Sequence, residues 1–474
     1  MKKCHKASSM SIPGSAWGKL AAFLDEWRDR NRPDESFSKF EERLHDMVCE
    51  LECEILAGEL ERYDIDVPVI EVDGERYKRV YRTEQVYLSG AGEVRVDRAV
   101  YRNSAGDRET ICPMELRAGI VEGYWTARAA ELGAWSVAHM TPGESEQLFS
   151  RFGGMKPSRS SLDRLPKALS ERWESKREHF EKTLRSEEEV PGEAVTLAVS
   201  LDGVKTPMRD GERKEKREAA REAGKQTKGP AGYRDVCCGT VSLYDREGDR
   251  LVTWRMARMP EKDSETLKRM LMEEVDSILS ARPDLRLIKL ADGARGNWTF
   301  LTEKLPDGDE CVDFFHAAEH LNLALADAYG ESSPKCKSQF QKLRLVLRDE
   351  MDGVEKIIRA LIYLTNKYPR RKKIKTELGY FRRNRHRMRY AELRARNFPI
   401  GSGVVEAACK TLVTQRLKRS GMRWRDEGGQ AILTLRAFCQ SDRFDRAWRL
   451  IAETYRSVVS LPEKVIPLRP KRAA

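Results

Sequence analysis

The amino-acid sequence predicts an α+β multidomain protein, and three observations support this. The chain has 474 residues, enough for about two to four domains. Segments with apolar residues at helical spacing alternate with segments in which apolar residues recur at every second position. Hydrophobic residues are 40% and charged residues 34% of the chain, which is typical of a charge-rich globular protein and excludes a collagen-like one.

The N-terminal part predicts helices followed by a small sheet. Residues 1–64 form the expected N-terminal helical region, in which Pro33 separates two stretches of helical periodicity. Residues 65–115 then contain short alternating runs rich in valine and tyrosine, with glycines between the runs. We therefore expect a small antiparallel β-sheet domain there.

Residues 116–190 predict a helical region similar to a helix-turn-helix. The turns at Thr141-Pro142-Gly143 and Gly153-Gly154 divide the helical pattern into three helices, and the third would begin near Ser158. This third helix is polar and contains arginine, so the region is a candidate DNA-binding element. Three short helices also form bundles that never contact DNA, and the sequence leaves both interpretations open.

Residues 191–316 predict the first part of a mixed-sheet core. Five strand-like runs occur there: 194–200, 236–243, 251–255, 285–290 and 310–315. A helical segment follows the third run, and a shorter one follows the fourth. This order of three strands, helix, strand, helix and strand is the layout of an RNase H-like fold, in which carboxylates at strand ends lie near one rim of the sheet.

The rest of the chain completes the expected core. Residues 317–396 are helical and basic, and we interpret them as an all-helical insertion. Residues 397–445 supply the last part of the core, where Ser402 is a candidate N-cap for a catalytic helix that carries Glu406 about one turn further on. Residues 446–474 are expected to form a C-terminal tail.

Three separated acidic residues are candidates for an active site: Asp202, Asp292 and Glu406. Each aspartate follows an apolar run and precedes a glycine, and the glutamate follows a glycine loop. An Asp-Gly pair taken singly is a common turn after a strand. In this order and on this fold, the three predict a site that binds two Mg²⁺ ions, for which Mn²⁺ would substitute, and that cleaves and joins phosphodiester bonds.

These motifs resemble those of a known enzyme family. Leu201-Asp202-Gly203, Ala291-Asp292-Gly293 and Gly401-Ser402-Gly403-x-x-Glu406 are similar to the DDE triad of bacterial insertion-sequence transposases. The segments 313–320 and 416–424 also resemble that family, and the nearest group is the ISKra type, which is related to Mutator-like transposases. The resemblance extends over most of residues 65–440.

The resemblance implies an activity and a set of roles. Asp202, Asp292 and Glu406 would be the catalytic, metal-binding carboxylates, and Asp313 with His316 would support them as an Asp-x-x-His motif. The protein would bind the ends of an insertion sequence and catalyse metal-dependent cleavage and strand transfer. Its partners would be double-stranded DNA of the element ends and of the target, and it would act as a homodimer or a higher multimer on DNA.

The positive charge of the chain fits a nucleic-acid partner. Lys and Arg number 87 against 76 Asp and Glu, a net charge of +11, which alone fits either a solvated surface or a polyanion partner. The basic residues concentrate within 370–396, among aromatic residues, and again around Trp424, which would pack or stack on a base. The candidate DNA-binding residues are Arg382, Arg383, Arg385, Arg416, Lys418, Arg419, Arg423 and Trp424.

Other functions fit parts of the sequence. His316-Ala317-Ala318-Glu319-His320 matches the H-x-x-E-H signature of inverted zinc proteases, but that interpretation leaves Asp202 and Asp292 without a role. An RNase H-like nuclease without strand transfer, or a DNA-binding protein with a lapsed catalytic core, fits the same carboxylates. Gly401-Ser402-Gly403 lacks the lysine of a phosphate-binding loop, so no nucleotide is expected.

The remaining features bear on the location of the protein. The ten cysteines include no C-x-x-C pair, so we expect reduced thiols. Cys112 stands alone where some relatives have paired cysteines, so no zinc site is carried over. We expect no membrane segment and a bacterial cytoplasmic protein, associated with the nucleoid when active, because no long apolar stretch or apolar signal core is present.

Overall fold

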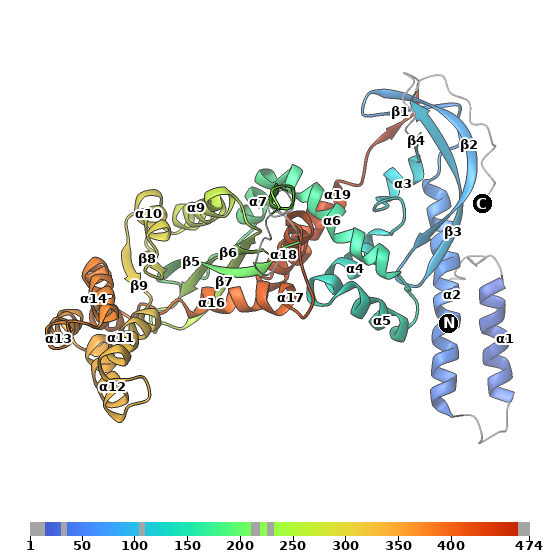
Figure 1. Cartoon of the computed structure of the whole chain (residues 1–474). Helices are drawn as coiled ribbons and strands as arrows, with labels where there is room; N and C mark the ends of the chain where they lie inside the picture. Colours follow the sequence, from blue (N-terminus) through green and yellow to red (C-terminus); the bar gives the residue numbers. More distant parts are fainter. Residues whose placement is uncertain (1–14, 30–35, 104–109, 210–218, 225–231, 463–474) are drawn as a thin grey trace, which may run out of the picture. The chain divides into compact units, whose positions relative to one another are not determined.

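The computed structural model of the chain describes residues 15–29, 36–103, 110–209, 219–224 and 232–462 (Figure 1). These residues form a mixture of helices and strands with two separate sheets, in agreement with the predicted α+β multidomain class. The chain divides into two compact units, Met1–Lys176 with Asp445–Ala474, and Arg177–Phe444. Among the described residues, no helix has the length and apolar character needed to cross a membrane.

The first unit begins with the helices α1 (Ser15–Asp29) and α2 (Phe37–Tyr63). Their aromatic side chains meet, with ring centroids 5.6 Å apart for Phe23 and Phe40 and 4.7 Å apart for Trp27 and Phe40. The expected break at Pro33 lies outside the described residues. The apolar spacing that predicted these helices therefore brings them together as a pair.

A five-stranded antiparallel sheet in the order β10-β1-β2-β3-β4 follows. Its strands are β1 (Val69–Val72), β2 (Glu75–Leu88), β3 (Glu93–Asn103), β4 (Thr110–Ile111) and β10 (Val459–Ser460). The antiparallel sheet agrees with the sequence prediction, but β2 and β3 are two long strands rather than several short ones. A bulge between Arg79 and Tyr81 interrupts their pairing without ending either strand.

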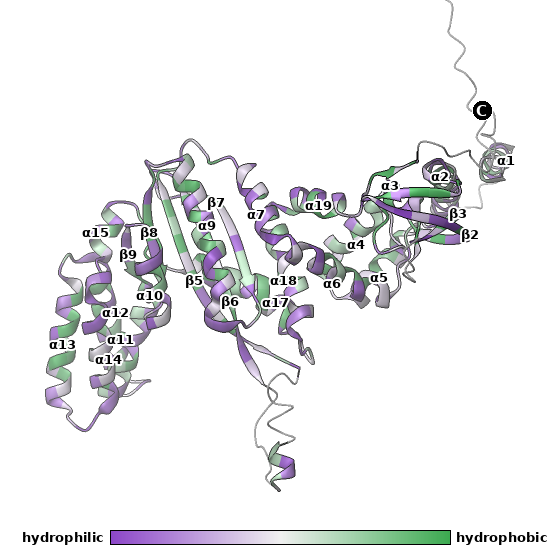
Figure 2. Cartoon of the chain, turned by 90° about the horizontal axis from the view of Figure 1, so that it is seen from above, coloured by the Kyte–Doolittle hydropathy of each residue, from purple (hydrophilic) through white to green (hydrophobic). Residues whose placement is uncertain are grey.

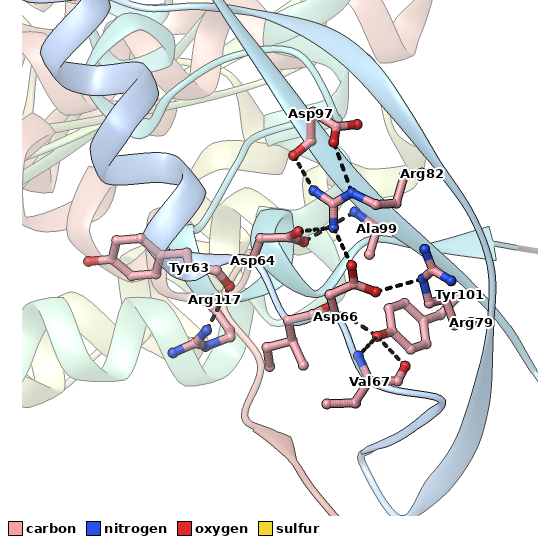
Figure 3. A network of polar contacts seen from close by, with 11 residues as sticks. Tyr63, Asp64, Asp66, Val67, Arg79, Arg82, Asp97, Ala99, Tyr101 and Arg117 are labelled. Carbon is pink, nitrogen blue, oxygen red and sulfur yellow. Dashed lines mark hydrogen bonds and ion pairs between the residues drawn. The ribbon is translucent and has the colours of Figure 1, made fainter. Parts of the chain in front are cut away.

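Arg82 of β2 joins the end of α2 to this sheet (Figure 3). Its guanidinium nitrogens lie 2.7 Å from Asp64, 3.1 Å from Asp66 and 2.9 Å from Asp97. Arg79 adds a second cation, 2.7 Å from Asp66. Because Asp64 and Asp66 are largely buried, the two arginines compensate carboxylates that would be costly without a partner.

A tail was expected for residues 446–474, but the described part of this segment, up to residue 462, packs in the first unit. After α19 (Phe444–Glu453), the guanidinium of Arg172 lies 3.7 Å from the ring centroid of Tyr455. The hydroxyl of Tyr455 donates a hydrogen bond of 2.8 Å to Glu122. The strand β10 then extends the sheet beside β1. Such a short strand at an edge carries little signal in the sequence.

The first unit also contains the three helices expected for a helix-turn-helix-like region: α4 (Ala127–His139), α5 (Pro142–Phe152) and α6 (Arg159–Ser175). Each begins at a side-chain cap. Thr126 accepts from the backbone of α4, Thr141 forms a capping box with Glu144, and Ser158 accepts from the backbone of α6. The preceding α3 (Pro113–Ala118) connects this bundle to the sheet. Its contact with DNA stays a prediction.

The second unit contains a mixed five-stranded sheet in the order β7-β6-β5-β8-β9. Its strands are β5 (Thr196–Pro207), β6 (Tyr233–Tyr244), β7 (Arg250–Arg258), β8 (Arg286–Ala291) and β9 (Asp309–Val312). The strands β5, β6 and β7 are antiparallel neighbours, whereas β8 and β9 run parallel to β5. The hydropathy colouring follows the burial, since β5 and β6 are hydrophobic inside the sheet and hydrophilic near residues 209 and 232 (Figure 2).

Helices cover both faces of this sheet. The helices α7 (Arg177–Ser186), α9 (Glu265–Ala281) and α10 (Arg295–Lys304) lie on one side in Figure 1. On the other side, α16 (Gly403–Ala408) continues through a π-helical turn, Cys409–Thr414, into α17 (Gln415–Leu417), and α18 (Asp426–Gln440) follows. The apolar clusters on the two faces make the sheet the centre of the second unit.

The expected helical insertion follows β9 directly. It consists of α11 (Phe314–Tyr329), α12 (Pro334–Asp349), α13 (Gly353–Lys367), α14 (Lys372–Asn384), a 3₁₀ turn (Arg385–Arg387) and α15 (Tyr390–Ala395). Apolar side chains such as Leu361 and Phe381 bury against one another between these helices and continue into the sheet core. The insertion therefore packs with the sheet as part of one core.

Candidate metal centre

Three aspartates share one edge of the mixed sheet. The parallel pairing of β5 and β8 places Ser200 opposite Leu290, so Asp202 and Asp292 lie two residues beyond the same point. The pairing of β8 and β9 places Ala291 opposite Val312, so Asp313 follows on the next strand. In sheets of this kind ligands bind at the carboxyl ends of parallel strands, and this edge is therefore the candidate site.

Asp202 is partly buried and close to other charged groups. Its Oδ1 accepts a hydrogen bond of 2.7 Å from the Gly203 amide, and its Oδ2 lies 3.8 Å from the thiol of Cys409. Burial raises the pKa of Asp202, and the neighbouring carboxylate of Asp292 raises it further, while His316 acts in the opposite direction. The first two predicted carboxylates are therefore within electrostatic reach of each other.

Asp292 is held at the end of β8 by the start of α10. Its Oδ1 accepts hydrogen bonds of 3.1 Å from the Ala294 amide and from the Asn297 side chain. The next residue is Gly293, and its neighbours leave no room for a side chain there. A Cβ atom on Gly293 would collide with the ring of Tyr380, 3.1 Å from its Cζ. The Asp-Gly pair is therefore explained by a close approach rather than by a left-handed turn.

Asp313 is fully buried and joins three segments of the site. Its Oδ1 accepts a hydrogen bond of 2.6 Å from the His316 amide and caps α11. Its Oδ2 accepts from the amide of Ser402, which ties α11 to the glycine loop before α16. The amide of Phe314 strengthens this connection with a 2.9 Å hydrogen bond to the Ile400 carbonyl.

Glu406 reaches the same place from α16. Its Oε1 lies 3.7 Å from Nε2 of His316 and accepts a hydrogen bond of 3.1 Å from the Ser402 hydroxyl. Asp313, His316 and Glu406 each offer an atom within 4.8 Å of the others, so this group could hold a metal ion. Sequence reasoning assigned Asp313 and His316 to support and Glu406 to the metal, whereas the structure places all three together.

Ser402 occupies the predicted cap position, although its side chain acts differently. Among the described residues, no hydrogen bond from this side chain caps α16. Its hydroxyl is directed to Glu406, and its amide is directed to Asp313. Ser402 therefore orients the glutamate rather than capping the backbone of the helix.

The two histidines of the H-x-x-E-H pattern do not share a site. His316 lies beside Glu406, whereas Nδ1 of His320 is 2.5 Å from Glu377 and the ring of His320 stacks on Tyr380 at 3.6 Å. Within the described part of the chain, the group able to hold a metal contains His316 without His320. This placement does not favour a zinc protease, which needs both histidines on one ion.

The predicted DNA-binding residues fall into two groups. Those with exposed side chains lie on α14, in the 3₁₀ turn after it and in the loop that follows α17: Arg382, Arg383, Arg385, Lys418, Arg419 and Arg423. At the surface, Arg385 forms an ion pair with Glu355, and the two charged groups are 3.5 Å apart. These positions are compatible with a phosphate-binding role, which stays a prediction.

Arg416 and Trp424 have a different environment. Arg416 is 2% exposed, and its guanidinium lies 5.5 Å from the centroid of the Trp424 ring. The indole nitrogen of Trp424 donates a hydrogen bond of 2.8 Å to the Leu417 carbonyl. We therefore correct the expectation for Arg416, which packs inside the fold. The half-buried Trp424 packs beside it, and its stacking on a base stays a prediction.

A comparison of the chain with protein-family models gave no match, and a comparison with curated protein sequences gave none either. The case for a function therefore depends on the site itself.

Two residues at this site were missed by sequence reasoning. Tyr380 comes from α14 of the insertion, and Cys409 comes from the π-helical turn after Glu406. Burial raises the pKa of Tyr380, and so do Asp292 and Asp313. No local motif in the sequence marks either residue. Gly293 is an indirect sign of Tyr380, because the ring of Tyr380 leaves no room for a Cβ atom at that position.

Proposed function

We propose that the protein is a DNA transposase of the DDE type and that its second unit is an RNase H-like catalytic core. One observation carries the proposal. Asp292 and Asp313 follow the ends of β8 and β9, Asp202 lies two residues beyond the last parallel pair of β5, and Glu406 extends from a helix to His316 and Asp313. The strand order, with three antiparallel strands and then two parallel ones, supports the RNase H-like interpretation. The motif resemblance assigns the reaction.

The donor atoms fit a hard divalent ion. Carboxylate oxygens predominate, with one imidazole nearby, and Mg²⁺ prefers such oxygen ligands while Mn²⁺ also accepts nitrogen. The raised pKa of Asp202 reflects burial and the nearby negative charge of Asp292, which a cation would relieve. Two bound ions would supply activation of the attacking oxygen and stabilisation of the leaving one.

The residues of the chain have separate parts in this proposal. Asp202, Asp292 and Glu406 would hold the ions, with His316 beside the glutamate. Asp313 acts indirectly, since it fixes the loop from which Glu406 extends. Water attacks the phosphorus at an element end, the bond to the 3′ oxygen breaks, and a free 3′-hydroxyl remains. That hydroxyl then attacks a target phosphodiester, so one bond forms as another breaks.

The proposed substrate is double-stranded DNA of the element ends and of the target. The exposed arginines and lysines near α14 and α17 would neutralise phosphates, and the three-helix bundle of the first unit is the candidate for end recognition. A homodimer or a higher multimer is required to hold two ends together. We place this activity in the bacterial cytoplasm, on the nucleoid, where chromosomal DNA lies.

Cleavage and joining of labelled DNA that carries the two ends of the element tests the proposal. The protein is incubated with Mg²⁺ or Mn²⁺, with EDTA as the control for metal dependence. Asp202→Asn, Asp292→Asn and Glu406→Gln should each reduce cleavage about 10³-fold or more while DNA binding is kept. Glu427→Gln removes an exposed carboxylate on α18 and should leave cleavage unchanged.

Each other outcome has a defined meaning. Cleavage without joined products would favour an RNase H-like nuclease without strand transfer. Binding of the ends without cleavage in either metal would favour a DNA-binding protein with a lapsed core. Full cleavage by the three variants would reject the assignment of the site.

A further inference from the structure

Tyr380 of the insertion lies against the backbone of the acidic site. The close contact between its ring and Gly293 brings α14 to the residue that follows Asp292. The ring of His320 stacks on that of Tyr380 with an interplanar angle of 21°, and Nδ1 of His320 is in turn held by Glu377. The position of the phenol ring is therefore fixed by both the site and the insertion.

The hydroxyl of Tyr380 has no evident structural purpose. It is buried, and no hydrogen-bond partner for it occurs among the described residues. Three carboxylates, Asp292, Asp313 and Glu377, and one cation, Arg383, act on it, so negative charge predominates around it. A buried hydroxyl without a partner is unusual in a folded protein, and a phenol among carboxylates is suited to donate to one of them.

Asp292 has an oxygen available for such a donor. Both side-chain hydrogen bonds that hold it, from Ala294 and Asn297, are accepted by Oδ1. A donor to Oδ2 would fix the second oxygen and hence the rotation of the whole carboxylate. Ligand groups at metal sites are commonly oriented in this way by neighbouring donors.

We propose that Tyr380 is a positioning residue of the metal centre. Its hydroxyl, which has no hydrogen-bond partner among the described residues of the metal-free structure, would donate to Oδ2 of Asp292 and orient that carboxylate when a divalent ion binds. The helical insertion thus completes the acidic site, and Gly293 is required because only a residue without a Cβ atom leaves room for the ring. This inference rests on the proposed metal centre and adds to it a residue from outside the three acidic motifs.

The test measures Mn²⁺ binding to the full-length protein without DNA. The electron paramagnetic resonance signal of the free ion reports how much Mn²⁺ stays unbound. Tyr380→Phe keeps the ring and removes only the hydroxyl, and it should weaken Mn²⁺ binding about tenfold, as expected for loss of one hydrogen bond to a charged group. Tyr244→Phe is the matched control. Tyr244 is a buried phenol paired with Thr196, at the end of β5 away from Asp202, and its variant should bind Mn²⁺ as the wild type does.

A second variant tests the role of the glycine. Gly293→Ala should displace the ring and weaken Mn²⁺ binding to a similar degree. The double variant Gly293→Ala/Tyr380→Phe should then bind Mn²⁺ with the same affinity as whichever single variant binds it less tightly, because both changes remove the same contact. Thermal unfolding without metal shows whether each variant folds, and an equal unfolding temperature for Tyr380→Phe excludes a merely structural effect.

The outcomes separate this inference from the proposed function. If the wild type binds Mn²⁺ and cleaves DNA but Tyr380→Phe binds Mn²⁺ equally well, the inference is wrong and the function stands. If the wild type binds Mn²⁺ without cleaving DNA, the function fails, and the ratio of affinities still decides the role of Tyr380. If the wild type binds no Mn²⁺, both are rejected.

Discussion

At the scale of single residues, the site concentrates acidic side chains that serve function rather than stability. Asp202 and Asp292 repel each other across neighbouring strands, and burial adds to the cost of the charge on Asp202. For an aspartate with a raised pKa, stability is lost as the pH rises through the folded-state value. The ionised carboxylate therefore destabilises the metal-free protein at neutral pH.

Asp202→Asn should stabilise the metal-free protein while it abolishes cleavage. The amide oxygen can still accept from the Gly203 amide, and the buried charge is gone. We expect the unfolding temperature in EDTA at pH 7 to rise by about 1–3 °C. Differential scanning calorimetry measures this shift against Glu427→Gln, for which no change is expected. A lower unfolding temperature for Asp202→Asn would mean that the carboxylate has a structural role.

At the scale of elements, the glycine loop and α16 depend on hydrogen bonds that bring Glu406 to the sheet edge. Ser402 supplies one of these bonds directly, and Asp313 fixes the loop from the side of α11. The position of the helix was predictable, since a glycine loop and an N-cap serine precede Glu406. The orientation of Glu406 was not, because it depends on Asp313, the N-cap of the distant helix α11.

Ser402→Ala should therefore lower cleavage at limiting Mg²⁺ about tenfold and leave stability nearly unchanged. For Ser333→Ala we expect the reverse, a loss of stability without a loss of cleavage, since the Ser333 side chain caps the N-terminus of α12. Removal of this cap should cost about 1 kcal/mol of stability. Urea unfolding and initial cleavage rates, measured on both variants, test this contrast. The same pattern in both variants would contradict the assigned role of Ser402.

Several strands and helices were predictable because their signals are local. The runs at 194–200 and 285–290 correspond to buried parts of β5 and β8, and the register between them aligns the two predicted aspartates. The length of β2 and β3 was not evident, since the polar pairs Thr83-Glu84 and Asp97-Arg98, which lie opposite each other in the two strands, interrupt the apolar alternation of the sequence. The approach of Tyr380 to Gly293 depends on how the insertion packs, which no local pattern records.

At the scale of the whole molecule, the chain separates into two units with different expected tasks. The first unit takes its last strand from the C-terminal segment, whereas the carboxylate site lies entirely within the second. Of the two elements in the described part of that segment, β10 has two residues and no periodicity to detect, whereas the helical spacing of Ala447, Trp448 and Ile451 in α19 was overlooked.

Removal of residues 445–474 should affect the units differently. The first unit would lose the contact of Tyr455 with Arg172 and the strand beside β1, so binding of the element ends should weaken about tenfold or more. Mn²⁺ binding should be unchanged, since the metal centre is in the other unit. Band-shift titrations and Mn²⁺ binding test the two expectations, and a parallel loss of both would contradict the separation.

The central claim is that four distant segments form one divalent-metal site, and localised cleavage of the polypeptide tests it most directly. Fe²⁺ replaces the natural ion, ascorbate and peroxide generate radicals at the bound metal, and mass spectrometry maps the cuts. We predict cuts near Asp202, Asp292, Asp313–His316 and Glu406 that excess Mg²⁺ suppresses. Cuts spread along the chain, cuts confined to one of these segments, or cuts that Mg²⁺ does not suppress would contradict the account.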